Sequence, residues 1–343
     1  MQPLGLPAEA VFIFISIVLL SIWADLFAHQ DAEEITVSNA VKWSLFWIAL
    51  ALGFYLYLWQ RFSREAADLY LAGYVLEKTL SVDNLMVFMA IFASFGIRNK
   101  LQHRILYFGI LGALVFRAIF VVIGASLFQA SPWVGFLFAA VVAWTAVKML
   151  QARGDGEAEL VDYSEHWSVR LTGRLLPVYT RLHLDRFFLR RSLVEKLTAE
   201  GGGAATRRGA FYATPAFLCL MAIETSDIAF AFDSVPAVIA VTHEPLLVYA
   251  AMIFAILGLR SLYFVLAALT RYLAHLEKAI VALLFFIAAK MTLHSWNLAV
   301  ADSGYHLSPA MSLAIILAVL ALGVAASIFF PPPADASEGA GPG

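Results

Sequence analysis

The apolar residues of this chain come in long blocks, not in the period-2 or period-3.6 patterns of elements with one wet face. A run of about 20 apolar residues matches a bilayer core of about 30 Å. The pattern therefore predicts an all-α polytopic membrane protein, a single membrane domain over 1–343 with about nine transmembrane helices. The predicted spans are 8–28, 41–60, 70–95, 104–128, 132–151, 211–241, 246–270, 279–297 and 309–330.

The polar segments divide this pattern unevenly. A hydrophilic insert at 151–210 separates the fifth span from the sixth and ends in the flexible stretch GGGAATRRG. Its mixture of basic and apolar residues suits either short helices on the membrane surface or a plain solvated loop. The start, MQPLGLPAEAV, has no basic residue before the apolar stretch, so a retained first span is expected and not a signal peptide. The tail, 331–343, is expected to be disordered.

Lysine and arginine set the predicted orientation, because cytoplasmic loops of membrane proteins carry an excess of them. The odd-numbered loops and the span ends that adjoin them hold sixteen, ten of them in the insert, whereas the even-numbered loops hold only Arg61 and Arg64. The N-terminus is therefore expected outside the cytoplasm, with the insert and the C-terminus inside.

Three charged landmarks recur in the same order along the chain. Glu77-KTLSV-Asp83-Asn84 in the third span corresponds to Asp227-IAFAF-Asp233-Ser234 in the sixth. An arginine follows in the fourth and seventh spans (Arg117 and Arg260), and a lysine in the fifth and eighth (Lys148 and Lys290). The pattern predicts one repeat over 70–151 and a second over 211–297. Because each copy has three spans, the two copies point in opposite directions, an arrangement typical of transporters with a midplane site.

The charges inside the spans are the candidate functional residues. An acid at a span centre costs roughly 2.5–3.5 kcal/mol on insertion scales, so such residues need partners, water or a ligand. Buried salt bridges are the alternative reading, since five acids balance five bases. Lys148 and Lys290 lie near span ends, where they could simply reach the interface, whereas the deeper Arg117 and Arg260 are expected to pair with acids. The acids are Glu77, Asp83, Glu224, Asp227 and Asp233; the bases are Lys78, Arg117, Lys148, Arg260 and Lys290.

Helical geometry limits how these acids can meet. At 100° per residue, Glu77 and Asn84 share one face, as do Asp227 and Ser234. Asp83 and Asp233 lie about 120° away from those faces. One straight helix cannot aim all the acids at one ion, so either the helices are interrupted or acids of the two repeats converge. Pro236 favours an interruption of the sixth span, and an ordinary packing kink is the alternative.

The ligand chemistry indicates a hard or borderline cation. Carboxylate, amide and hydroxyl oxygens suit magnesium, calcium and manganese. None of the eight histidines falls in the middle of a span, so an imidazole site for zinc or copper is not expected. The predicted metal ligands are Glu77, Asp83, Asn84, Glu224, Asp227, Asp233 and Ser234. Asp25, near the inner end of the first span, is either a gate residue or a wetted helix end.

Composition excludes other classes. Only 14% of the residues are charged and the mean hydropathy is +0.80, against about 25% charged in soluble domains. A net charge of −2 gives no basic field for nucleic acid. A single cysteine, Cys219, can form neither an internal disulfide nor a CxxC pair, which argues against a thiol oxidoreductase. The chain is not expected to be an enzyme or to hold a permanent cofactor.

Two long segments resemble a known family. YVLEKTLSVDNLMVF and ATPAFLCLMAIETSDIAFAFDSVPAVIAVT are similar to the two signature spans of the TerC/Alx family of bacterial inner-membrane proteins, and the Alx branch fits best. The resemblance covers about 41–292. It implies manganese export, with older labels of tellurite resistance and membrane-bound redox modulation. It places the family's acidic positions at Glu77, Asp83, Glu224, Asp227 and Asp233.

Energetics favour a coupled carrier over a passive pore. Moving one charge across 100 mV takes about 2.3 kcal/mol, and a divalent ion takes twice that. Proton antiport through one of the carboxylates is the simplest supply. Two other readings stay open: a carrier of an oxyanion or small organic solute, and a membrane scaffold whose buried charges only hold helices together.

Overall fold

The structure is a computed structural model, and it describes residues 12, 14–17, 20, 37–97, 100–152, 163–182, 186–200, 203–242, 244–269, 276–300 and 307–329. Nine long helices account for most of this part of the chain: α2 Val37–Arg61, α3 Arg64–Ser94, α4 Lys100–Ala130, α5 Pro132–Ala152, α8 Pro215–Thr242, α9 Pro245–Ile256, α10 Leu259–Leu269, α11 Leu276–Ala299 and α12 Pro309–Phe329. The predicted first span and Asp25 lie outside the described residues.

Within the described residues, six helices are long and apolar enough to cross a membrane, namely α2, α4, α5, α8, α11 and α12. The consecutive helices α9 and α10 together add a bent seventh. The third predicted span corresponds to α3, which has 31 residues but carries six charged side chains in its first twenty, Asp68, Glu77, Lys78 and Asp83 among them. An integral membrane protein with several helical spans is therefore confirmed, whereas the number nine stays a prediction.

Proline and serine define several helix starts. α5, α8, α9 and α12 each begin at a proline, where the missing N–H and the fixed φ suit a first helical turn. α3 is capped by Ser63, whose hydroxyl accepts a hydrogen bond from the Ala66 N–H at 3.0 Å.

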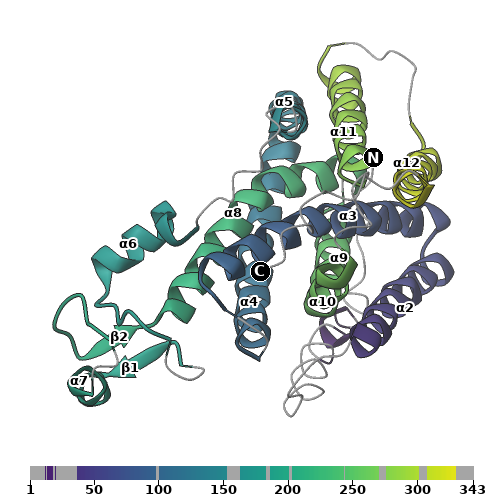
Figure 1. The fold of residues 1–343 in the computed structure, drawn as a ribbon. Helices are drawn as coiled ribbons and strands as arrows, with labels where there is room; N and C mark the ends of the chain where they lie inside the picture. Colours follow the sequence, from purple (N-terminus) through teal and green to yellow (C-terminus); the bar gives the residue numbers. More distant parts are fainter. Residues whose placement is uncertain are drawn as a thin grey trace.

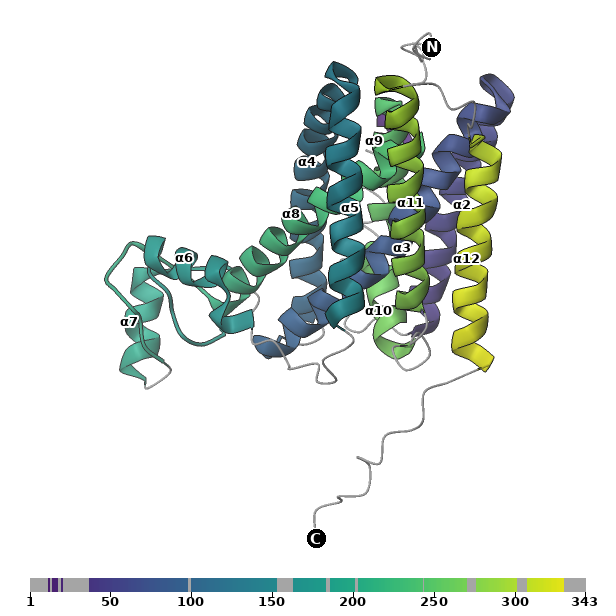
Figure 2. The same ribbon diagram turned by 90° about the horizontal axis from the view of Figure 1, so that it is seen from above.

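Two long helices run obliquely through the bundle. In Figure 1, α5 and α12 are seen nearly end-on, whereas α3 and α8 are seen along their length. Figure 2 shows α5, α11 and α12 standing side by side. α3 packs on α8 and α9, α8 packs on α4, and α5 packs on α11. The first helix of each predicted repeat thus contacts the second helix of the other, as two-fold-related repeats would require; the inverted relation itself stays a prediction.

The break in the bundle is not where the sequence analysis placed it. α8 is one continuous helix with Pro236 in its interior, so the predicted interruption there is wrong. The seventh predicted span is broken instead, because α9 and α10 meet at an angle of 48°. Gly258 between them has φ +80°, a backbone conformation that glycine adopts at little cost. The indole of Trp47 fills the space in front of this glycine.

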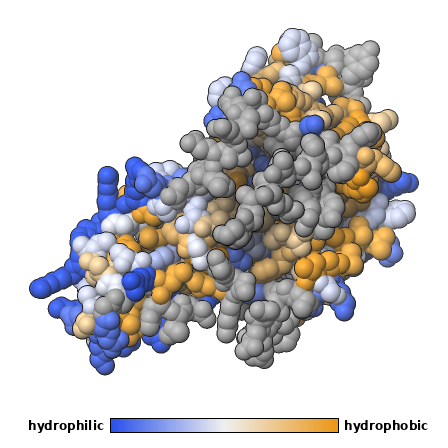
Figure 3. Space-filling model, viewed as in Figure 1, coloured by the Kyte–Doolittle hydropathy of each residue, from blue (hydrophilic) through white to orange (hydrophobic). Residues whose placement is uncertain are grey.

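The described part of the insert folds beside the end of α8 (Figures 1 and 2). It contains the short helices α6 Trp167–Leu175 and α7 Arg191–Ala199, a single 3-10 turn at Tyr163–Glu165, and strand β1 Phe188–Arg190. Strand β2 Phe211–Ala213 follows the insert directly, at the start of the predicted sixth span. The two strands pair antiparallel, with Leu189 opposite Tyr212. Figure 3 shows hydrophilic residues gathered over this region, whereas many of the coloured residues of the helical part are apolar. The plain solvated loop is therefore wrong for this part of the insert.

Candidate cation site

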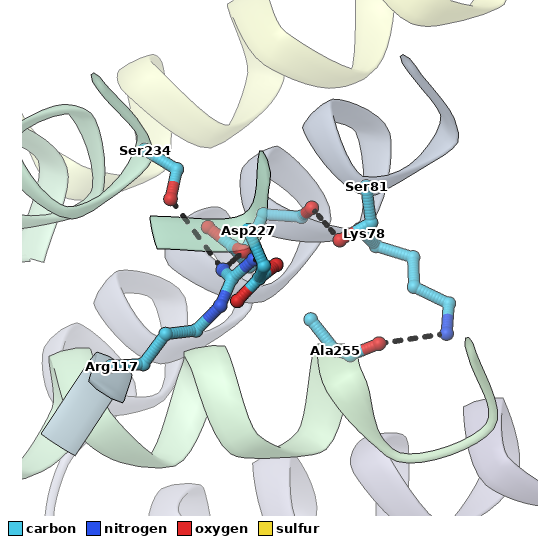
Figure 4. A network of polar contacts seen from close by, with 7 residues as sticks. Lys78, Ser81, Arg117, Asp227, Ser234 and Ala255 are labelled. Carbon is cyan, nitrogen blue, oxygen red and sulfur yellow. Dashed lines mark hydrogen bonds and ion pairs between the residues drawn. The ribbon is translucent and has the colours of Figure 1, made fainter. Parts of the chain in front are cut away.

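A buried arginine joins acids from both predicted repeats. Arg117 of α4 is 1% exposed and forms ion pairs with Glu77 of α3, which is fully buried, and with Asp227 of α8. The second pair joins Arg117 Nη2 to Asp227 Oδ1 at 3.1 Å. Figure 4 shows the Arg117 guanidinium directed toward Asp227 and Ser234 of α8. The three residues form the Glu77–Arg117–Asp227 network, and the expectation that Arg117 pairs with acids is confirmed.

The seven-residue spacing explains how two side chains of α8 contact Arg117. Arg117 Nη1 lies 3.5 Å from Ser234 Oγ, two turns beyond Asp227 on the same face of α8. On α3, the Ser81 hydroxyl donates to the Glu77 carbonyl at 2.7 Å, which satisfies the hydroxyl within its own helix. The predicted faces are therefore those that meet at Arg117.

The network leaves carboxylate oxygens without partners. Glu77 Oε2 and Asp227 Oδ2 are buried and have no hydrogen-bond partner in the described part of the protein. Two carboxylates and one guanidinium also sum to a charge of −1 in an apolar environment. Buried acceptors without partners typically cost about 1–3 kcal/mol each, and more when they are charged. These two oxygens therefore lack the hydrogen bond, proton or cation that would stabilise them.

Asp83 and Asp233 form a second group on the other faces of α3 and α8. The Asp233 carboxylate is close enough to Asp83 and to Arg117 to interact electrostatically with both, and it lies within hydrogen-bonding reach of Thr145 of α5. Asn84, the neighbour of Asp83, is 8% exposed. The structure thus brings oxygens of α3, α5 and α8 into one region.

Glu224 occupies a third position, against a glycine. It is half-buried, and its carboxylate lies directly over Gly112 of α4, where an added Cβ would come within 2.1 Å of both carboxylate oxygens. Glu224 is also close enough to Asp227, three residues later, to interact with it electrostatically. Gly112 therefore makes room for this acid.

The remaining bases take different roles. Lys78 Nζ donates to the carbonyl of Ala255 at 3.0 Å (Figure 4). It also donates to the carbonyl of Leu257 at 3.4 Å, and both carbonyls lie at the broken end of α9. Lys290 is buried, and its Nζ lies 3.4 Å from the Val241 carbonyl near the end of α8. Both ammonium groups thus satisfy carbonyls that a helix end leaves open.

Lys148 and Arg260 do not mirror their counterparts in the other repeat. Lys148 is exposed, with its ammonium 5.5 Å from the ring centroid of Trp144, as expected of a residue near a span end. Arg260 is 3% exposed, and its Nη1 lies 3.3 Å from His103 Nδ1 of α4. The charged positions are alike in sequence but not in contacts.

The five acids do not converge on one point. Among the described residues, no three His, Cys, Asp or Glu side chains are grouped so that they could hold one metal ion. The acids lie in three groups instead: Glu77 with Asp227 on Arg117, Asp83 with Asp233, and Glu224 over Gly112. A ligand set that includes all five at once is not present in this conformation.

Comparison with known proteins assigns the family. The profile described as "Integral membrane protein TerC family" matches residues 62–333, which is most of the chain. The chain belongs to the TerC family. The tellurium resistance protein TerC of Serratia marcescens is 48% identical over 98% of both chains, and its namesake from an Alcaligenes species is 47% identical over the same shares. Alx of Escherichia coli K12, whose name gives it as a candidate membrane-bound redox modulator, is 34% identical over 91% of both chains.

These values correct one detail of the sequence analysis. Both proteins named TerC share more identity with this chain than Alx does, so a best fit to the Alx branch is wrong. No solved structure matches the chain.

Sequence analysis of this TerC family chain missed several residues around the acids. Thr145 lies in the apolar stretch AVVAWTAVKML, where a lone hydroxyl one turn before Lys148 was a readable signal. Gly112 and His103 gave no such signal, because a glycine or a histidine at a helix start has many structural uses. Their roles became visible only from the contacts with Glu224 and Arg260.

Proposed function

We propose that this chain is an inner-membrane transporter that exports a divalent metal cation, with manganese as its cargo and protons as the coupling ion. The observation that carries the proposal is the burial of acids from both predicted repeats around one arginine, at the contact of α3, α4 and α8. Ionisable residues inside membrane helices are rare and are by default candidates for an ion pathway. The N-terminus would lie outside and the C-terminus in the cytoplasm.

Asp83 and Asp233 are the proposed first ligands of the cargo. Both belong to the acidic signature segments, and they approach each other from α3 and α8. Ser234 and Thr145 supply neutral oxygens nearby, and the buried Asn84 directly follows Asp83 on α3. Two carboxylates with amide, hydroxyl and water oxygens are a normal ligand set for a hard divalent cation. Glu77, Glu224 and Asp227 would then flank the ion or receive it at a later step.

The broken helix α9–α10 supports movement. Interrupted spans near the midplane are where transporters expose backbone carbonyls and change shape. Here the break lies beside α3, since Lys78, the neighbour of Glu77, donates to its carbonyls. A shift of α10 relative to α9 would therefore change the hydrogen bonds of Lys78 and, through the adjacent Glu77, the Glu77–Arg117–Asp227 network.

The names of the relatives agree with an ion-handling role without specifying it. Tellurium resistance is a phenotype that a metal or oxyanion transporter could supply. The redox label of Alx has no counterpart in the thiols of this chain, since Cys219 is its single cysteine and is buried. An oxyanion carrier would need arginine at the site in excess of acids, which is the reverse of the composition here.

The test is transport by purified protein in liposomes. We expect manganese uptake or release against a proton gradient, weaker movement of magnesium and calcium, and poor movement of zinc. Asp83→Asn and Asp233→Asn keep size but remove charge, and each should abolish transport without loss of expression. Asp68→Asn is the matched control, because Asp68 is a buried acid of the same helix, about 22 Å along α3 from Asp83, and pairs with Arg64 instead.

The same variants separate the alternatives. If the buried charges only hold helices together, Asp83→Asn and Asp233→Asn should lower the melting temperature, and the wild-type protein should move no ion. Robust zinc transport without manganese transport would refute the choice of cargo.

A further inference from the structure

The guanidinium of Arg117 occupies the place that a cation would take between the two repeats. It binds one oxygen of Glu77 from α3 and one oxygen of Asp227 from α8. The second oxygen of each acid, Glu77 Oε2 and Asp227 Oδ2, is buried without a hydrogen-bond partner in the described residues. Each acid therefore has one oxygen paired with the guanidinium, which is covalently attached to α4, and one oxygen that is not paired with it.

A divalent ion and this guanidinium cannot share the two acids in one arrangement. First-shell distances for hard divalent cations are about 2.0–2.6 Å. An ion bound to the spare oxygens would thus lie within a few ångströms of the guanidinium, where like charges repel strongly in a medium of low dielectric constant. The arginine must then withdraw from the carboxylates for the ion to bind them.

A second set of acceptors for the guanidinium is already adjacent. Arg117 Nη1 lies 3.5 Å from Ser234 Oγ, and the charge of Arg117 acts on the neighbouring Asp233. Withdrawal toward Ser234 and Asp233 keeps the positive charge next to an acid and releases Glu77 and Asp227. The same movement lets the guanidinium replace the ion at Asp233. The ion would therefore pass from Asp233 to Glu77 and Asp227 as the guanidinium moves in the opposite direction.

We propose that Arg117 is a tethered competitor of the transported cation, holding Glu77 and Asp227 in the empty protein and exchanging them for Asp233 and Ser234 when the ion advances. This inference rests on the proposed function, because it specifies how the same site discharges its cargo. It also assigns the two predicted repeat arginines unequal roles, since Arg260 contacts His103.

The experiment measures Mn²⁺ binding to the full-length protein in lipid nanodiscs, by titration of the free-ion paramagnetic resonance signal. The variants are Arg117→Gln, Arg117→Lys and Arg260→Gln. Removing the competitor should lower the Kd of Arg117→Gln by about tenfold, equivalent to about 1.4 kcal/mol. Arg260→Gln is matched in charge and burial and should keep the wild-type Kd. An unchanged or higher Kd for Arg117→Gln overturns the proposal.

Thermal unfolding with and without Mn²⁺ supplies a second readout. Arg117→Gln leaves two buried acids without a cation, so it should be less stable than wild type in the absence of metal. The competitor proposal requires Mn²⁺ to raise its melting temperature more than it raises that of wild type. An arginine that only clamps the helices predicts the same loss of stability with no larger rescue, and that result also overturns the proposal.

Arg117→Lys decides the question if Arg117→Gln does not fold. A lysine keeps the charge but cannot offer the planar fork that reaches two carboxylates at once. Its weaker hold should lower the Kd for Mn²⁺ by several-fold, and a Kd equal to or above wild type overturns the proposal. If the wild-type protein neither binds nor transports any divalent cation, the proposed function has failed. If the wild-type protein binds Mn²⁺ and the Arg117 variants bind it with an unchanged Kd, only the competitor proposal has failed.

Discussion

Replacement of Gly258 by alanine tests whether the α9–α10 break is a built feature of the bundle. Gly258 has φ +80°, and a Cβ there would lie 2.4 Å from Cδ1 of Trp47, whose ring is 1% exposed. The left-handed backbone costs an alanine about 1–2 kcal/mol. Forcing the buried indole aside costs about 1–3 kcal/mol more, as in other overpacked cores. Gly258→Ala should therefore lower the free energy of unfolding by about 2–5 kcal/mol.

Gly96→Ala is the control that separates the two contributions. Gly96 also has a positive φ, +62°, but nothing lies within 4 Å of its added Cβ. It should lose only the backbone part, about 1–2 kcal/mol. The assay is chemical or thermal unfolding in detergent, with the double variant Trp47→Ala/Gly258→Ala added as a cycle. The double variant should be more stable than the sum of the two single losses implies. If Gly258→Ala costs no more than Gly96→Ala, the close contact of Trp47 with the break is not part of what holds the bundle together.

Three further outcomes are expected. Gly112→Ala should change the unfolding free energy by less than about 1 kcal/mol, since alanine favours a helix. The added methyl group must displace the Glu224 carboxylate, so manganese flux in liposomes should fall by about tenfold. Unchanged flux would mean that Glu224 is not part of the ion pathway. Lys78→Met keeps the side-chain length but loses charged hydrogen bonds to the end of α9, so it should cost about 1.5–3 kcal/mol by thermal unfolding; a loss below about 0.5 kcal/mol would mean that the carbonyls find water instead. Leu171→Cys places an exposed thiol in the insert, which is proposed to be cytoplasmic, so an impermeant maleimide should label it only in inside-out vesicles. Cys219 is buried and should not add to the labelling. Labelling in intact cells would reverse the proposed orientation.

The helices and the acid pairing were predictable because each leaves a strong local signal. Apolar blocks fix where a helix can cross lipid, and the six candidate spans fall within a few residues of the predicted ones. The spacing of Asp227 and Ser234 put both on one face, and Arg117 contacts both. Which arginine would reach the acids was not predictable, since Arg117 and Arg260 hold equivalent places in the sequence pattern. Only the packing of α4 against α8 separates them.

The position of the break was misread for a physical reason. Pro236 removes one backbone hydrogen bond, yet neighbouring helices can support a proline inside a membrane helix, so α8 continues through it. Gly258 changes the chain direction because it can adopt a positive φ. The two-stranded sheet of β1 and β2 was missed because each strand has only three residues, too few for an alternating pattern to be read, and because about twenty residues separate the strands.

The network also bears on how the chain is made. Glu77 and Arg117 sit on the consecutive helices α3 and α4, so the two charges can enter the bilayer as a neutral hairpin as soon as the ribosome has delivered both. Asp227 is synthesised 110 residues after Arg117. At about 5–20 residues per second, it arrives roughly 5–20 s later. During that interval the first half of the molecule is charge-balanced at this point without the second, and the excess negative charge appears only when α8 docks. Assembly of the two halves, and not insertion of either half, is therefore the step that creates the uncompensated negative charge at Arg117.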